Sequence, residues 1–219
     1  MAELERLRKM LNQIEVEMPE ETLEALLWFR DELLRWNKRI NLTAITDPSE
    51  TLEKHLVDSL TLLPYLPHQG HLLDMGSGGG FPGIPLKIAR PALSIWSVDA
   101  VAKKIAFQKH VARSLKMVGF TALHERLEDL PDIELMPRFD VVLARAFASL
   151  AEIVHLAKPL LTPRGEIVAM KGAEGLQELT ESAAVLKDAG FGCTKKEQLQ
   201  LPESKAQRIL LFLTRTDKA

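Results

Sequence analysis

Apolar residues recur along the chain in two different patterns, and the change between them comes near residue 66. Residues 1–66 contain no glycine, and an apolar stripe at helical spacing follows Met18 and Pro19. Its members are Leu23, Leu26, Leu27, Leu33 and Leu34. A second stripe begins after Asp47 and Pro48 and consists of Leu52, Leu56, Leu60 and Leu63. Together with an amphipathic segment that ends near Gln13, these stripes predict an N-terminal helical region over residues 1–66.

After Gly70 short apolar runs alternate with helical segments. We expect seven strands, at residues 71–75, 94–99, 121–124, 139–145, 165–171, about 192–199 and 206–214. Helices are expected between the first five strands and at about residues 176–189. Parallel neighbours need long crossover connections, so this alternation predicts a mostly parallel sheet with helices on both faces, in an α/β core over residues 67–219. The polar segment LPESKAQ is too short for a helix, so the last two strands should form an antiparallel hairpin at the sheet edge.

Composition excludes several classes of protein. With 219 residues, 46% of them apolar, the chain can bury a large core and is not a disordered segment. No window approaches 18 uninterrupted apolar residues and the start MAELERLRKM is charged, so we expect neither a membrane span nor a secretion signal. Cys193 is the one cysteine, which excludes an intramolecular disulfide and favours the cytoplasm.

The net charge of -2 argues against a nucleic-acid partner, but the charges are segregated along the chain. Residues 1–30 hold seven acidic and four basic side chains. Residues 85–116 hold seven basic side chains against Asp99 alone: Lys87, Arg90, Lys103, Lys104, Lys109, Arg113 and Lys116. Binding to a polyanion depends on the local field rather than on the sum. Lys109, Arg113 and Lys116 would share one helix face, which predicts an RNA contact; a solvated helix surface is the alternative.

The segment HLLDMGSGGGFPGIPLKIA carries the clearest functional signal. Five glycines lie between positions 76 and 83, directly after a predicted buried strand, where a ligand can approach the backbone. Positions 78–83 match G-x-G-x-x-G, which with Asp99 would fit a nicotinamide dinucleotide and an oxidoreductase. From Asp74 the loop is D-x-G-x-G-x-G, the nucleoside-binding turn of S-adenosylmethionine-dependent methyltransferases. The closing hairpin favours this second interpretation.

Five motifs in register carry a more specific resemblance. They are WNKRINLTAI at residues 36–45, EKHLVDSL at 53–60, LLDMGSGGGFPGIPL at 72–86, ARAFASL at 144–150 and MKG at 170–172. Together they resemble the bacterial 16S ribosomal RNA guanine-N7 methyltransferases of the RsmG family, also called GidB. The resemblance implies a Rossmann-like class I methyltransferase core with S-adenosylmethionine as the cofactor. It also implies that the substrate is 16S rRNA within the small ribosomal subunit or an assembly intermediate. We expect the protein to be a monomer.

The same resemblance implies individual site residues. The family's cofactor contacts fall on Gly76, Phe81, Leu127, Glu128 and Arg145. Leu127 stands where Ala or Val is expected, a conservative change if the backbone makes the contact. Gly78 belongs to the same loop, and the carboxylate of Asp99 would accept hydrogen bonds from the ribose hydroxyls.

The reaction that the resemblance implies requires no acid or base catalysis. Guanine N7 has a free in-plane lone pair, so we expect no general base, no catalytic side chain and no metal. The enzyme's task would be to position the guanine edge and to exclude water. The chain also lacks an Asn/Asp-Pro-Pro-aromatic motif after the fourth strand, and Cys193 lies too late in the chain to be a pyrimidine-methylating nucleophile.

Several polar residues have two open interpretations. Asn37 and Asn41 would contact the bound nucleotide or cap the helix end. Lys171 would contact RNA phosphate or end a strand in solvent. His55, Asp58 and Ser59 have the residue types of a hydrolase triad, but neighbours on one exposed helix cannot form an oriented relay, so we expect them to hold the helix against the core. As alternative functions the chain could be a small-molecule methyltransferase, an NAD-dependent oxidoreductase or a nucleotide-binding module without catalysis.

Overall fold

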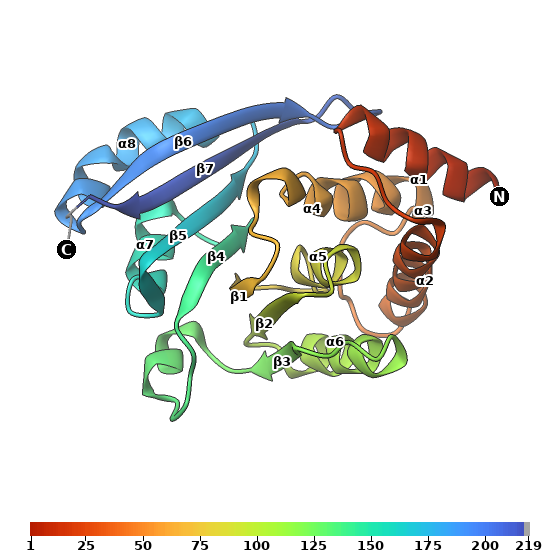
Figure 1. Ribbon diagram of the computed structural model, residues 1–219, viewed down its shortest axis with the longest axis horizontal. Coiled ribbons are helices and arrows are strands. Elements are labelled where there is room, and N and C mark those ends of the chain that lie inside the picture. Colours follow the sequence, from red (N-terminus) through yellow and green to blue (C-terminus); the bar gives the residue numbers. More distant parts are fainter. Residues whose placement is uncertain (217–219) are drawn as a thin grey trace.

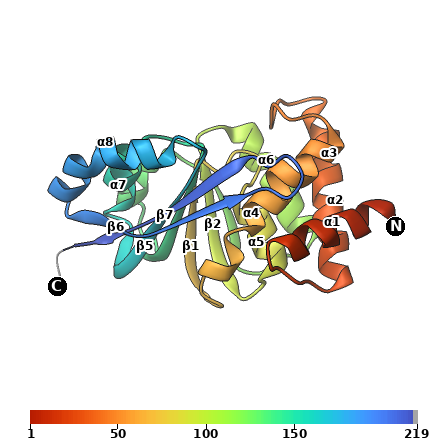
Figure 2. The ribbon, with the colours of Figure 1, turned by 90° about the horizontal axis from the view of Figure 1, so that it is seen from above.

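A seven-stranded sheet runs through the middle of the molecule and separates two groups of helices (Figures 1 and 2). The structure is a computed structural model that describes residues 1–216, so the last three residues of the predicted core lie outside it. The strands are β1 (Gly70–Met75), β2 (Leu93–Asp99), β3 (Phe120–His124), β4 (Phe139–Arg145), β5 (Leu161–Lys171), β6 (Phe191–Gln200) and β7 (Gln207–Arg215). Their order is β3-β2-β1-β4-β5-β7-β6, and β7 runs antiparallel to both neighbours. The predicted fold class and edge hairpin are confirmed.

The sheet order places the point where the strand connections change direction between β1 and β4. The chain moves outward from β1 to β2 and β3, and then returns to add β4 on the other side of β1. Connections that leave two adjacent parallel strands in opposite directions open a crevice at the carboxyl ends of those strands. The segments that follow Met75 and Arg145 therefore border the same crevice.

Helices cover both faces of the sheet. One face carries α1 (Ala2–Gln13), α2 (Glu20–Asn37), α3 (Pro48–Thr51), the π-helical η1 (Leu52–Val57), α4 (Asp58–Leu60), the 3-10 turn η2 (Leu63–Tyr65), α5 (Gly83–Ala89) and α6 (Ala102–Ser114). The other carries the 3-10 segment η3 (Leu127–Asp132), α7 (Leu150–Ala157) and α8 (Gly175–Asp188). Strand residues alternate between the faces: Leu72 packs with the N-terminal helices and Leu73 packs with α7. None of the helices in the described residues is long and apolar enough to cross a membrane.

Two predicted helices differ in the structure. The third N-terminal helix is interrupted by the π-helical turn η1, in which Glu53 and His55 are buried together with the apolar stripe. Between β3 and β4 the chain forms only the six-residue η3, because Pro131 within it lacks the N–H that a longer helix needs. Turns of π-helix are often found at functional sites, and η1 lies beside the crevice.

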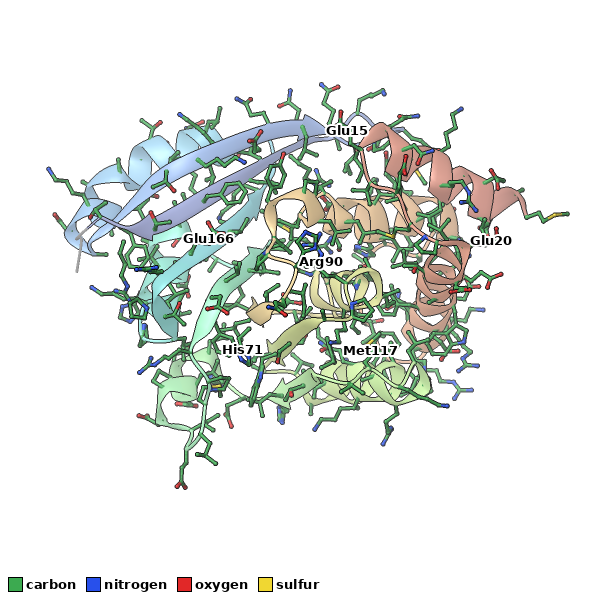
Figure 3. The ribbon with its side chains drawn as sticks, viewed as in Figure 1. Glu15, Glu20, His71, Arg90, Met117 and Glu166 are labelled. Carbon is green, nitrogen blue, oxygen red and sulfur yellow. The ribbon has the colours of Figure 1, made fainter. Side chains whose placement is uncertain are left out.

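The tip of the β6–β7 hairpin is fastened to η1. The carboxylate of Glu53, which is 3% exposed, accepts hydrogen bonds from the backbone N–H of Glu203 and of Ser204. Arg6 of α1 forms an ion pair with Glu203 as well. On the other side of α4, Arg90 donates to the backbone oxygens of residues 63, 66 and 67; Figure 3 shows it between α4 and α5. The helical layer is thus fixed at both ends, and η1 has a defined position over the sheet.

Candidate functional site

The glycine loop follows β1 and faces the crevice. Gly76 and Gly78 have φ angles of +63° and +57°, a region that other residues rarely adopt. The N–H of Gly78 donates to Oδ2 of Asp99 at 2.9 Å, while Oδ1 of Asp99 accepts from the N–H of Val101. The carboxylate that was predicted to meet the ribose therefore lies directly beside the loop, with further lone pairs free for two hydroxyl donors.

The loop leaves room for a ligand. A Cβ atom built on Gly78 would meet no atom of the described residues within 4 Å. Gln108 of α6 supports the loop from below, because its Nε2 donates to Oγ of Ser77 and to the carbonyl oxygen of Gly78. The loop presents backbone groups beside the carboxylate of Asp99, whose Oδ2 also lies 3.6 Å from Nζ of Lys104. These features fit the nucleoside part of S-adenosylmethionine.

Asp74 lies in β1, two residues before Gly76 of the loop, and is fully buried. Its Oδ2 accepts a hydrogen bond from the N–H of Gly83 at 2.9 Å, which ties the start of α5 to the strand. Oδ1 has no hydrogen-bond partner within residues 1–216. Burial raises the pKa of Asp74 to about 7, although the Gly83 N–H acts in the opposite direction.

Phe81 was predicted to contact the cofactor, but its ring lies in the core. The ring is 5% exposed and stacks on the imidazole of His55, with 4.5 Å between the centroids. Phe29 of α2 packs against it, and the guanidinium carbon of Arg145 lies 5.3 Å from its centroid. A contact from Phe81 to a ligand in the loop would therefore use its backbone.

Arg145 ends β4 and points to the N-terminal helices. Its guanidinium donates to Nδ1 of His55 at 3.1 Å, and to Oδ2 of Asp58 and the carbonyl oxygen of Lys54, both at 3.3 Å. Arg208 of β7 donates to Oδ1 of Asp58 at 2.8 Å. The contacts confirm that His55 and Asp58 hold the helix against the core. The helix is not exposed as predicted, since the exposures of His55 and Asp58 are 7% and 4%.

A cavity of 310 Å³ opens beside Arg145 at the carboxyl ends of β4 and β5. Four cationic side chains line it, together with the carboxylate of Asp58 and the ring of His55; the cations are Lys54, Arg145, Lys171 and Arg208. Lys171 is held in place because its Nζ donates to the carbonyl oxygen of Ala148 and to Glu178. It is therefore neither a solvated strand end nor a free surface cation. We refer to this cavity as the acceptor pocket.

The remaining predicted residues lie around these two features. Leu127 is buried and Glu128 is exposed; both follow β3, whose last residue lies beside Asp99 in the sheet. The side-chain amide of Asn37 binds the backbone of residues 42 and 43 and so closes the loop after α2. Asn41 is exposed on that loop. The side chain of Asn37 therefore fastens the loop and does not cap the helix, and Asn41 is accessible.

The basic stretch is only in part a surface. Lys109 and Arg113 are exposed on α6, as the sequence predicted. Lys87 is 3% exposed and donates to the carbonyl oxygens of Pro91 and Leu93, and Arg90 binds backbone oxygens as described above. These two residues of the basic stretch therefore have backbone carbonyl partners within the protein.

Sequence reasoning missed three residues of the site. Lys54 and Arg208 line the acceptor pocket, and Phe147 lies against the glycine loop. Arg208 comes from the last strand and has no signal in the local sequence. Lys54 and Phe147 lie within motifs that define the resemblance, which is the signal that pointed to their neighbourhood.

Comparison with known proteins gives the family. The model of GidB, rRNA small subunit methyltransferase G, matches residues 22–210. A protein named ribosomal RNA small subunit methyltransferase G from Syntrophotalea carbinolica is 49% identical, with 96% of this chain and 97% of the relative aligned. Its namesake from Acinetobacter baumannii is 42% identical, over 90% of this chain and 91% of the relative.

Solved structures show the same fold at low sequence identity. A ribosomal protein L11 methylase from Lactobacillus delbrueckii superposes with a TM-score of 0.57 at 15% identity, over 79% of this chain and 81% of that one. A SAM-dependent methyltransferase from Aquifex aeolicus gives a TM-score of 0.56 at 13% identity, over 84% and 97% of the two chains. With the extent of the family match, these findings show that this chain belongs to the GidB family of S-adenosylmethionine-dependent small-subunit rRNA methyltransferases.

Proposed function

We propose that this protein transfers a methyl group from S-adenosylmethionine to N7 of one guanine in 16S rRNA. The observation that carries the proposal is the acceptor pocket, which is rich in hydrogen-bond donors and includes Arg145 at the end of β4, the strand next to β1. Guanine presents the acceptors O6 and N7 on one edge. Arg145 and Lys171 are suited to O6, which lies next to N7 on that edge.

The cofactor would lie along the glycine loop. Bound there, S-adenosylmethionine supplies a methyl group on a sulfonium centre. We propose that Gly76 and Gly78 approach it through their backbone, that Asp99 accepts from the ribose, and that Leu127 and Glu128 border the adenine. Phe81 contributes its backbone, and Arg145 separates the cofactor from the helical layer.

Methyl transfer to N7 needs position rather than proton removal. The lone pair of N7 is already free, so the residues of the acceptor pocket act by holding the base in line and by excluding water. Arg145 is well suited to this task, because Asp58, His55 and the Lys54 carbonyl fix the direction of its guanidinium. No general base is assigned.

We propose that the RNA reaches the pocket across the helical side of the molecule. Lys109 and Arg113 on α6 would contact phosphates, and Asn41 lies on the loop that Asn37 closes. The helical region of residues 1–66 would then form the acceptor side of the core of residues 67–219. A target guanine has to be unstacked to enter a pocket of this kind, which favours a small subunit or an assembly intermediate, in the cytoplasm, as the substrate of a monomer.

The test is a transfer assay with two forms of the RNA. The purified protein is incubated with methyl-labelled S-adenosylmethionine and either naked 16S rRNA or small subunits from a strain that lacks this enzyme. We expect label in 7-methylguanine in at least one of the two. Label confined to adenine, cytosine or a small metabolite would contradict the proposal, and binding of NAD without binding of S-adenosylmethionine would favour an oxidoreductase.

A further inference from the structure

Phe147 lies between the two halves of the site. It belongs to the short segment that joins β4 to α7, and its side chain is 36% exposed. A Cβ atom built on Gly76 would lie 2.3 Å from Cδ2 of this ring and 3.0 Å from two further ring atoms. The ring therefore rests directly on the backbone of the glycine loop, at a distance that only glycine permits.

The backbone on both sides of Phe147 is held firmly. Ala146, which lines the acceptor pocket, has a φ of +47°, a conformation that is costly for a residue with a side chain. Lys171 donates to the carbonyl oxygen of Ala148 at 2.7 Å, and Glu178 accepts from the N–H of Leu150 at 2.8 Å. Strained backbone persists where its surroundings determine it, and it is found at ligand sites. Here the strain turns the chain so that Phe147 lies over the loop instead of in the core.

Guanine N7 imposes a geometric condition at this place. Its lone pair lies in the plane of the base, so the bond to the methyl group has to form in that plane. Hydrogen bonds to one edge of the base leave it free to tilt about that edge. A flat side chain against one face of the base removes this freedom, and aromatic rings are the usual partners of unstacked bases.

We propose that Phe147 stacks on the target guanine and sets its plane relative to the glycine loop. This assignment rests on the proposed function, because it needs a base in the acceptor pocket. Phe147 is then a substrate-positioning residue at the border between cofactor and acceptor. Stacking of one base on one aromatic ring is worth about ten- to a hundredfold in binding.

Three substitutions separate stacking from simple packing. Phe147→Ala removes the ring, Phe147→Leu keeps apolar bulk without an aromatic face, and Phe147→Tyr keeps the face. Leu135→Ala is the matched control, because Leu135 is 92% exposed and lies in the segment before β4, away from the site. For each variant we would measure kcat and KM with 16S rRNA, and the Kd for S-adenosylmethionine by calorimetry.

With the alanine and leucine variants kcat/KM for RNA should fall about tenfold or more, while the tyrosine variant and the control stay within about threefold of the wild type. The Kd for S-adenosylmethionine should change by less than about threefold in all of them. Unchanged kcat/KM in Phe147→Ala, or full activity in Phe147→Leu, would overturn the assignment while the wild type still methylates guanine. A wild type that methylates no guanine would overturn the proposed function itself.

Discussion

The guanidinium of Arg145 lies 3.1 Å from Nδ1 of His55 and thereby fixes the proton on that ring. A guanidinium only donates, so Nδ1 has to accept and the proton of the neutral imidazole sits on Nε2. Nε2 lies 2.7 Å from Oγ1 of Thr43, which makes His55 a link between the loop after α2 and the end of β4. Burial and the positive charge of Arg145 lower the pKa of His55 to about 3.

Because of this low pKa, His55 should lower the free energy of unfolding in acid. In the unfolded chain the ring takes up a proton near pH 6.5, whereas in the folded protein it stays neutral down to about pH 3. Acid therefore favours the unfolded chain, by about 2 kcal/mol for this one group between pH 7 and pH 5. Urea unfolding should show that the stability advantage of the wild type over His55→Gln shrinks by that amount. An advantage that is equal at both pH values would mean that the folded ring binds a proton.

Asp74 predicts a change of the opposite sign. Its folded pKa of about 7 lies above the ordinary value of 3.8, so the folded protein binds a proton that the unfolded chain releases. Between pH 7 and pH 5 this group should stabilise the fold by about 2 kcal/mol, since protons favour the state that binds them. The stability of the wild type relative to Asp74→Asn should rise accordingly in the same urea series. If it does not change between these pH values, Asp74 is ionised in the folded protein.

A charged side chain at Gly78 should abolish cofactor binding. The space next to Gly78 holds no atom of the described chain, and Oδ2 of Asp99 is bound to its N–H. Gly78→Asp would fill that space and place a second carboxylate there, with an expected loss of S-adenosylmethionine affinity of at least about a hundredfold. Calorimetry that finds normal affinity in Gly78→Asp would place the cofactor elsewhere.

Charge reversal on α6 should weaken the binding of RNA and leave the binding of S-adenosylmethionine unchanged. The double variant Lys109→Glu and Arg113→Glu removes two exposed cations, so RNA affinity should fall and the slope of log affinity against log salt should decrease by about 2. S-adenosylmethionine affinity should not change. The matched control reverses Lys187 and Lys196, exposed cations on α8 and β6. Equal losses in both double variants would indicate a general effect of net charge rather than a contact at α6.

The sequence was sufficient to predict the sheet, the hairpin and the place of the glycine loop. The apolar run that forms the buried end of β1 and the density of glycine after it are local features, so they are visible without the fold. The sequence was also sufficient to predict that Gly78 and Asp99 lie at the same edge of the sheet. Gly78 follows β1, and Asp99 ends the neighbouring parallel strand β2.

The burial of polar groups could not be predicted in the same way. Glu53 and Asp58 are buried because hairpin residues far along the chain, Ser204 and Arg208, supply their partners. Lys87 is buried and Arg90 is half-buried because nearby loops present carbonyl groups to them. Phe147 is a single aromatic residue in the connection from β4 to α7 and belongs to no periodic pattern. Its position over the glycine loop depends on the strained turn at Ala146, which a sequence pattern does not reveal.

The proposed reaction is the transfer of a methyl group to the in-plane lone pair of guanine N7. The most direct measurement compares 16S rRNA with the same RNA made from 7-deazaguanosine, in which a C–H group replaces N7. We expect methyl transfer to the ordinary RNA and none to the substituted RNA, which should compete with the ordinary RNA as an inhibitor. Methyl transfer to the substituted RNA at the ordinary rate would contradict this proposal.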